Sequence, residues 1–452
     1  MISVRSFLSF PLSKKDTFLH ILLIAMTIIV AFNANGTMKE TGKLVASLQL
    51  VFIISHLSHY KGLQALANLY KKHNLILWFA LLWLVSSTLS TLYATLFEHL
   101  AHSQIRTTIY RETFVIVHVL FILSCSSFLL NAGIQVSSYF KVFGFCLLAI
   151  LLYYSWLINM EPPRTADEWF RSPPLFRHIR EVGWFAAIGF AFSTNQYLSA
   201  TSCKRFDANN IFWASVAIAS LSLILWTGGR AVIFSAFVCL CLLLARNFHR
   251  SPIAIRTALR LALMVVCSLL IAKSLTVAEW NGLDRILGTT YSITTTTPGQ
   301  VSADSLTTGR AHMWSAALNA VKDNPLLGLG PNGYSRILPR LYGMQPHNIV
   351  VQVLVEWGVI GALLITPIGL FLIIRCIKIL FKSENADLVS ASLVVLILSL
   401  NSFFSGTLFY SYPVFFFCLA LSACLAFPPP EASKQKSFKP RLKTATPSPY
   451  MP

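Results

Sequence analysis

The chain has 452 residues, of which 55% are hydrophobic and only 12% are charged, and its formal net charge is +19 at pH 7. Soluble domains carry ~25% charged residues, so this composition excludes a soluble protein and indicates a polytopic helical membrane protein. Apolar runs of about 20 residues, the length that a helix needs to cross the hydrocarbon layer, recur along the whole chain. We therefore expect an all-α protein with about twelve transmembrane helices.

The expected spans follow one another, mostly with short connections. From the amino terminus they cover residues 17–34, 44–60, 74–97, 112–132, 139–160, 183–201, 209–226, 231–246, 257–278, 357–377, 387–408 and 411–427. The first run is too long for a signal peptide and lacks a small-residue cleavage site, so we interpret it as a retained span. The chain then divides into spans one to nine in 1–278, a long helical loop at 279–356, three spans in 357–427 and a basic, disordered tail at 428–452.

Lysine and arginine set the expected orientation, because loops rich in both stay in the cytoplasm. More than half of the 36 lysines and arginines lie on the side of the amino terminus, which places both termini in the cytoplasm. The opposite, outer side has mostly arginines: 106, 111, 164, 171, 177, 180, 230, 285, 310, 336 and 340. The arginine fork binds phosphate oxygens in pairs, so this side is suited to a phosphorylated ligand. Contact with lipid headgroups is the alternative, and for Arg164 and Arg180 both interpretations hold equally.

The polar segment 305–361 carries the strongest candidate for a catalytic base. It contains Gln345-Pro346-His347-Asn348, directly followed by an apolar run. Proline suits the first turn of a helix, so we expect Pro346 to open a helix with His347 and Asn348 in that turn. The helix dipole disfavours an imidazolium there, and a neutral His347 can accept a proton. A lone histidine is more often structural, but the polar outer setting favours a functional one.

Four arginines and a tryptophan complete the candidate site. We expect Arg310 to begin a helix that runs to about residue 323, with Trp314 one turn later on the same face. Arg336 and Arg340 are one turn apart on a short helix ahead of the histidine. Arg230 follows a double glycine at the outer end of a span, where a ligand can approach the backbone closely. The alternatives are a membrane-anchoring tryptophan ring and arginines that contact headgroups.

The sequence indicates no metal, cofactor or nucleic-acid site. The nine cysteines fall almost all within apolar runs, and no Asp-x-Asp pair or His and carboxylate cluster has metal-ligand spacing. A lipid-linked sugar pyrophosphate would therefore be bound by arginines alone. Because pyrophosphate is a good leaving group, transfer of the sugar to a hydroxyl needs charge stabilisation and one base. Direct displacement would invert the anomeric configuration.

Three stretches together resemble the O-antigen ligase/polymerase family of bacterial envelope enzymes. They are Thr227-Gly228-Gly229-Arg230-Ala231, then Gly309-Arg310 with Trp314 followed by Asn324-Pro325-Leu326-Leu327-Gly328-Leu329-Gly330, and Pro346-His347-Asn348 ahead of a helix that ends Trp357-Gly358. The resemblance implies glycan transfer from undecaprenyl pyrophosphate on the periplasmic face of the inner membrane, without a metal, in a GT-C-like fold. It also implies that Arg230, Arg310 and His347 are essential. Relatives often have serine where this chain has the glycine pair.

The acceptor differs within that family. A ligase transfers the glycan to lipid A–core, a polymerase extends the glycan, and a third branch glycosylates proteins. The moderate outer loop and the lack of a large soluble domain favour a ligase, with a polymerase second. A transporter of lipid-linked sugars is the alternative from another class, but carriers usually have an internal repeat and charges near the membrane midplane.

Overall fold

The computed structural model describes residues 14–32, 38–58, 60–98, 100–160, 165–199, 207–250, 255–276, 282–283, 310–337 and 346–427. Arg164, Arg340 and the basic tail, about which we made predictions, lie outside the described residues, as does most of 279–309. Within the described ranges the regular structure is helical, without a strand. The predicted all-α class is therefore confirmed for this part of the chain.

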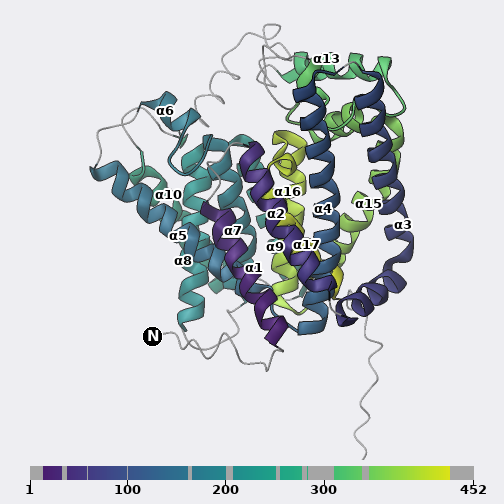
Figure 1. The fold of residues 1–452 in the computed structure, drawn as a ribbon. Coiled ribbons are helices and arrows are strands. Elements are labelled where there is room, and N and C mark those ends of the chain that lie inside the picture. Colours follow the sequence, from purple (N-terminus) through teal and green to yellow (C-terminus); the bar gives the residue numbers. More distant parts are fainter. Residues whose placement is uncertain are drawn as a thin grey trace, which may run out of the picture.

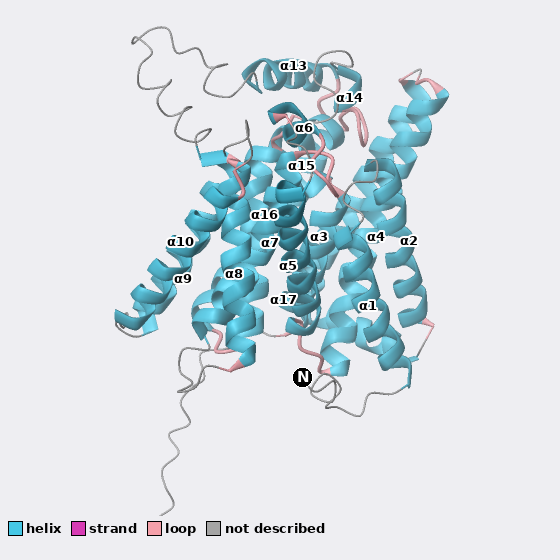
Figure 2. Cartoon of the chain, turned by 90° about the vertical axis from the view of Figure 1, so that its left-hand side faces the viewer, coloured by secondary structure: helices cyan, strands magenta, loops and turns pink. Residues whose placement is uncertain are grey.

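Twelve long helices form the body of the molecule described here (Figure 1). They are α1 (Lys14–Phe32), α2 (Met38–Leu57), α3 (Tyr60–Phe97), α4 (His102–Ala132), α5 (Ser137–Met160), α7 (Ile179–Ser199), α8 (Ala208–Thr227), α9 (Arg230–Arg250), α10 (Ile255–Ser274), α15 (Ile349–Lys382), α16 (Ala386–Ser405) and α17 (Ser411–Ala426). Shorter helices are α6 (Ala166–Arg171), α13 (Arg310–Asp323), α14 (Tyr334–Ile337) and the 3₁₀ turn η3 (Thr407–Phe409). Figure 2 shows α6, α13 and α14 gathered at one end of the bundle, and α1 begins at the other end.

Nine of the described helices are long and apolar enough to cross a membrane. Each of the twelve predicted spans falls on a long helix, but α2, α7 and α17 are not among the nine, so a total of twelve spans stays a prediction. The reason is clear for α7, which is buried on nearly every side and carries polar residues that pair with α16. The Asn195 amide donates to Ala386 O (3.0 Å), and the Gln196 amide donates to Asp387 Oδ1 (2.7 Å). A buried helix can keep such residues because its neighbours satisfy them.

The helix α15 is longer than the predicted span 357–377 and is sharply bent. It begins at Ile349, and Gly358 has a non-helical backbone with φ +62°. Residues 324–330 bind to the bend: Leu329 N donates to Val355 O (2.7 Å) and Gly330 N to Glu356 O (2.9 Å). In return, the amides of residues 359 and 360 donate to Pro325 O (2.8 Å) and Leu326 O (3.2 Å). The connector thus replaces the helical hydrogen bonds that the bend breaks, which is why irregular backbone is tolerated here.

Two glycines make this contact possible. Gly328 and Gly358 both have positive φ angles, +68° and +62°. A Cβ on Gly328 would lie 2.6 Å from Gly358 N, and one on Gly358 would overlap Leu326 O. Ser90 of α3 closes the junction, with its hydroxyl 2.6 Å from Leu327 O and 2.9 Å from Glu356 O. The glycines of the Asn-Pro-Leu-Leu-Gly-Leu-Gly stretch therefore serve the backbone packing that fixes the first half of α15.

Gly358→Ala is expected to lower the stability of the folded protein by at least about 2 kcal/mol, because the new methyl group adds backbone strain and a collision with Leu326 O. The measurement is thermal unfolding of the purified protein in detergent. Gly369→Ala is the matched control, since Gly369 lies in the same helix and a Cβ there meets nothing within 4 Å. Equal unfolding temperatures for the two variants would contradict the role of the bend.

Candidate active site at the α13 end of the bundle

Arg230 is positioned by the end of α8. Gly228 caps α8 in the left-handed conformation (φ +61°, ψ +22°), with its N–H donating to Leu225 O (3.2 Å). A Cβ at this position would lie 2.6 Å from Gly282 O, so the glycine also permits close approach of another segment. The chain reverses here, and Arg230 becomes the first residue of α9. Gly228 is thus explained by a helix cap and a close backbone contact, whereas a Cβ on Gly229 would meet only ordinary contacts from 3.8 Å.

Arg310 and Trp314 lie one turn apart on α13, as predicted, and both reach the segments that surround the site. The Arg310 guanidinium donates to Phe404 O, near the end of α16. The Trp314 indole N–H donates to Pro346 O at 2.8 Å. Trp314 therefore holds the backbone next to His347 in place.

His347 precedes α15 rather than lying in its first turn, which corrects our prediction. The helix begins at Ile349, and the residue that caps it is Asn348, whose Oδ1 accepts from Val350 N (2.9 Å) and Val351 N (3.2 Å). Proline was expected at the first helical position, but the Asn348 side chain satisfies those amides better from the N-cap position. Asn348 is thus a helix cap, and the two amides that it binds are not available to an anion.

The backbone of His347 is left-handed, with φ +54°. Non-glycine residues rarely adopt this conformation, which costs of order 1–3 kcal/mol and is found disproportionately at functional sites. The imidazole lies against α16 and α7: Nδ1 is 3.3 Å from Ser405 O, and Nε2 is 3.5 Å from the Arg180 guanidinium. The Ser405 carbonyl can only accept, so we assign the ring proton to Nδ1, which leaves the Nε2 lone pair to accept a proton.

A cavity of about 510 Å³ opens beside these residues, and we call it the arginine cavity. Three of its lining residues are Arg180 of α7, Arg230 of α9 and Arg310 of α13. The described lining contains no acidic residue. It is lined by Ile179, Arg180, Gly183, Trp184, Thr227, Gly228, Gly229, Arg230, Ala231, Val232, Phe234, Arg310, Trp314, Phe404 and Ser405. Burial, together with the charges of Arg180 and Arg230, lowers the pKa of Arg310 to about 10. Three clustered guanidiniums are suited to a ligand with several negative charges.

The same charges act on His347. Burial and the positive charges of Arg180 and Arg310 lower its pKa to about 4, although the hydrogen bond with Ser405 O opposes this shift. The imidazole is therefore neutral at physiological pH when the cavity holds no anion. A multivalent anion on the arginines would offset their charges and raise this pKa, so ligand binding would strengthen the base.

Of the remaining predicted site residues, Arg180 lies at the arginine cavity and Arg336 does not line it. Arg180, predicted only as a supporting residue, lies at the centre, where it contacts His347. Arg336 is not among the residues that line the arginine cavity; its guanidinium donates to Leu329 O of the connector. The sequence analysis missed Phe404 and Ser405, since two residues at the end of an apolar span carry no sequence signal for a site. No group of three or more His, Cys, Asp or Glu side chains in the described ranges is arranged to hold a metal ion.

Comparison with known proteins agrees with the sequence resemblance. Residues 215–366, which include Arg230, Arg310 and His347, match the O-Antigen ligase family. A stretch of 236 residues is 25% identical to the exopolysaccharide production protein ExoQ of Rhizobium meliloti (strain 1021). That alignment covers 49% of this chain and 50% of the relative, so the chain spans about half of the relative's length. The resemblance to this family is therefore confirmed, and together with the apolar helices it indicates a multi-pass membrane protein.

Proposed function

Because residues 215–366 carry the O-Antigen ligase match, we propose that this protein is an O-antigen ligase that transfers O-antigen polysaccharide from undecaprenyl pyrophosphate to a hydroxyl of lipid A–core. The observation that carries this proposal is the convergence of Arg180, Arg230 and Arg310 on one cavity beside His347. These cations come from three separate helices and meet an imidazole whose Nε2 contacts the Arg180 guanidinium. The arrangement supplies the two functions that the reaction needs, which are stabilisation of a leaving pyrophosphate and a base.

The donor pyrophosphate binds to the arginine cavity in this proposal. Negative charge grows on the leaving pyrophosphate as the glycosidic bond breaks, and the three guanidiniums stabilise that charge. The positions of two of them are fixed by the fold: Arg310 is tied to Phe404 O, and Arg230 begins α9 at the α8 turn. Pre-positioned charges stabilise a transition state without reorganisation during the reaction. No general acid is required, since the pyrophosphate leaves as an anion.

His347 accepts the proton of the acceptor hydroxyl. The hydroxyl oxygen attacks the anomeric carbon, the bond from that carbon to the phosphate oxygen breaks, and the proton moves to Nε2. The donor pyrophosphate draws the Arg180 guanidinium away from Nε2 and raises the basicity of the imidazole, so the base acts when the donor is present. Attack opposite the leaving group inverts the anomeric configuration.

The proposed location is the bacterial inner membrane, with both termini in the cytoplasm and the active site facing the periplasm. Two observations support it. The described bundle has nine helices that are long and apolar enough to span, and Arg310 of α13 lines the arginine cavity. Figure 1 shows α13 at the end of the bundle opposite the start of α1. The lysine-rich loops, which mark the cytoplasmic side, fall at the α1 end by sequence.

A glycan polymerase is the second candidate, favoured by one specific observation. The relative that matches along about half of its own length is an exopolysaccharide production protein. A polymerase would use the same pyrophosphate cavity and the same base with a different acceptor. Transfer to a protein is a third possibility within the same chemistry.

The test is a lipopolysaccharide gel of a deletion strain with and without the complementing gene, alongside analysis of undecaprenyl-linked glycans. A ligase leaves core without O-antigen and long lipid-linked polymer in the deletion strain. A polymerase instead leaves core that bears single repeat units. Normal lipopolysaccharide in the deletion strain would refute the ligase proposal and direct attention to other exported glycans.

The pH dependence of the reaction tests the environment of His347. With a pKa of about 4 in the free protein, the imidazole stays neutral as the pH falls, so kcat/KM should decline only below about pH 5. Arg180→Gln removes a charge that lowers this pKa, so the acidic decline should move to higher pH. The measurement is the pH profile of transfer in proteoliposomes, with Arg106→Gln at an exposed outer position as the control. A decline that moves to lower pH in Arg180→Gln would contradict the assignment.

A further inference from the structure

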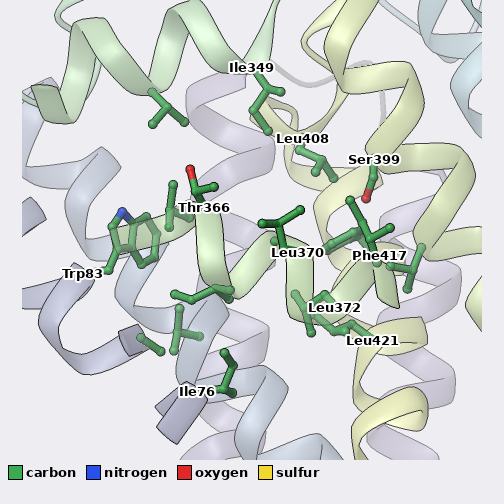
Figure 3. A pocket seen from close by; sticks show the side chains of 18 of the residues that line it. Ile76, Trp83, Ile349, Thr366, Leu370, Leu372, Ser399, Leu408, Phe417 and Leu421 are labelled. Carbon is green, nitrogen blue, oxygen red and sulfur yellow. The ribbon is translucent and has the colours of Figure 1, made fainter. Parts of the chain in front are cut away.

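A second large cavity lies on the opposite side of the α16 end from the arginine cavity. It has a volume of about 580 Å³ and is lined by residues of α3, α4, α15, α16, η3 and α17. Figure 3 shows its apolar side chains, among them Ile349, Leu370 and Phe417. The hydroxyl of Thr366, one of its few polar lining groups, is bound to Ala362 O at 2.7 Å within the same helix. We call this space the apolar cavity, and its wall is suited to hydrocarbon chains.

One end of the apolar cavity is polar. A smaller cavity of about 210 Å³ shares Trp83, Ile349 and Phe417 with it and adds Arg111 and Glu356 to the lining. The indole N–H groups of Trp83 and Trp357, which both line this end, are buried without a hydrogen-bond partner, and the two side chains are only 7% and 5% exposed. Buried donors are normally satisfied, so two orphan N–H groups in one cavity indicate a ligand that supplies oxygen acceptors.

The end of α16 and η3 separate the two cavities. Phe403 and Leu408 line the apolar cavity, whereas Phe404 and Ser405 line the arginine cavity. This wall is fixed by buried hydrogen bonds: Thr407 Oγ1 lies 2.7 Å from Ser405 Oγ and 3.1 Å from Asn401 Oδ1. A rigid wall of this kind keeps one lipid molecule from occupying both cavities at once.

His347 lies on this wall. Its Nδ1 is 3.3 Å from Ser405 O on the arginine side, and Ile349, two residues later, lines both the apolar cavity and its polar end. A base at the boundary between two lipid-sized spaces is what a reaction between two membrane-anchored substrates requires, because their reacting groups must meet at one point.

We propose, on the basis of the proposed function, that the apolar cavity binds the hydrocarbon chains of the acceptor glycolipid and that its polar end binds the acceptor's head. The acceptor hydroxyl then reaches Nε2 of His347 at the edge of the wall, where it meets the anomeric carbon of the donor. Trp83 and Trp357 present hydrogen-bond donors to sugar or phosphate oxygens, and their rings continue into the hydrocarbon site. Arg111, which donates to Phe409 O (3.2 Å), adds a positive charge to the same lining.

The donor's chain has its own exit, which is why we assign the apolar cavity to the acceptor. Phe234 of α9 and Phe404 of α16 line the arginine cavity, and their ring centroids are 5.7 Å apart. Both side chains are exposed at the side of the bundle, 47% and 42% respectively. A polyprenyl chain attached to a pyrophosphate in the arginine cavity can leave along these rings into the membrane without crossing the wall.

The experiment narrows the apolar cavity and measures each substrate separately. Ala362→Phe places a ring inside it, and Leu363→Phe is the matched control, because Leu363 is the next residue of α15, is 68% exposed and does not line the cavity. We expect Ala362→Phe to raise the KM for the acceptor lipid at least about tenfold, with the donor dissociation constant unchanged. Trp83→Phe, which keeps a ring and removes the N–H, should raise the acceptor KM several-fold.

A measurement on the unmodified protein guards against misfolding of these variants. An acceptor with a photoreactive group on its acyl chain should label peptides of α15 and α17, and a donor with a photoreactive polyprenyl chain should label peptides of α9. Labelling of α15 by the donor chain, or weaker donor binding in Ala362→Phe with an unchanged acceptor KM, would overturn the assignment. If the wild type transfers the glycan neither to lipid A–core nor to another glycan, the proposed function is refuted, whichever helix the lipids label.

Discussion

Replacing His347 by alanine is expected to lower the rate of glycan transfer by roughly 10²–10⁴-fold, the usual contribution of a general base, while donor binding changes little. The reason is the position of the imidazole, whose Nε2 lies beside the arginine cavity while Nδ1 is held at Ser405 O. Alanine removes the proton acceptor and leaves the three arginines in place. The measurement is transfer in proteoliposomes, with donor binding determined separately on the same preparation.

His102→Ala is the matched control for this variant, because His102 is an exposed histidine at the start of α4 and belongs to neither α7 nor α16, the two helices that contact His347. The same pair of variants separates the enzyme from a transporter of lipid-linked sugars. A carrier needs no base, so it would keep its activity when His347 is replaced. Full activity of His347→Ala would therefore end the assignment of this residue as the base.

Replacing Arg310 by alanine is expected to weaken both donor binding and transfer, with kcat/KM reduced on the order of 10²-fold or more. Arg310 acts in two ways: its charge faces the cavity with Arg180 and Arg230, and its guanidinium donates to Phe404 O on the wall. Arg310→Lys keeps the charge but not the planar fork, so it should recover only part of the activity. The measurements are donor affinity and the rate of transfer at saturating acceptor.

Arg106→Ala is the control for the loss of an arginine at the outer end, since Arg106 is exposed on α4 and lies outside the cavity lining. Arg336→Ala gives a second comparison. Its guanidinium donates to Leu329 O, so we expect this variant to lower the unfolding temperature more than the donor affinity. An Arg310→Ala protein with normal donor affinity and normal transfer would contradict the pyrophosphate site.

The sequence predicted the helices well because the membrane imposes a simple rule. Hydrocarbon excludes unpaired backbone groups, so an apolar run of sufficient length must be helical wherever it lies. The run 183–201 shows the limit of the rule: α7 forms there, but its buried Asn195 and Gln196 bond to α16 rather than face lipid. Hydropathy cannot distinguish such a buried helix from one that contacts lipid.

Local chemistry predicted some parts of the site and not others. Arg310 and Trp314 share a helix face because four residues make about one turn, which depends on the sequence alone. The predicted start of α15 was wrong. Both Pro346 and Asn348 are residues that favour a helix start, and the choice between them depends on the contact of Trp314 with Pro346 O. Arg336 was grouped with the other arginines by its position near His347 in the chain, yet it contacts the connector.

The sequence by itself determined the class of the protein, its helices, and the residue types proposed to bind phosphate and accept a proton, since these follow from hydropathy, helix periodicity and side-chain chemistry. Only the tertiary structure decided which arginines line one cavity. Arg180, Arg230 and Arg310 are 50 and 80 positions apart in the chain, and the packing of α7, α9 and α13 brings them together. The wall at residues 403–409 likewise could not be predicted from the local sequence, because it exists only where α16 packs between two cavities.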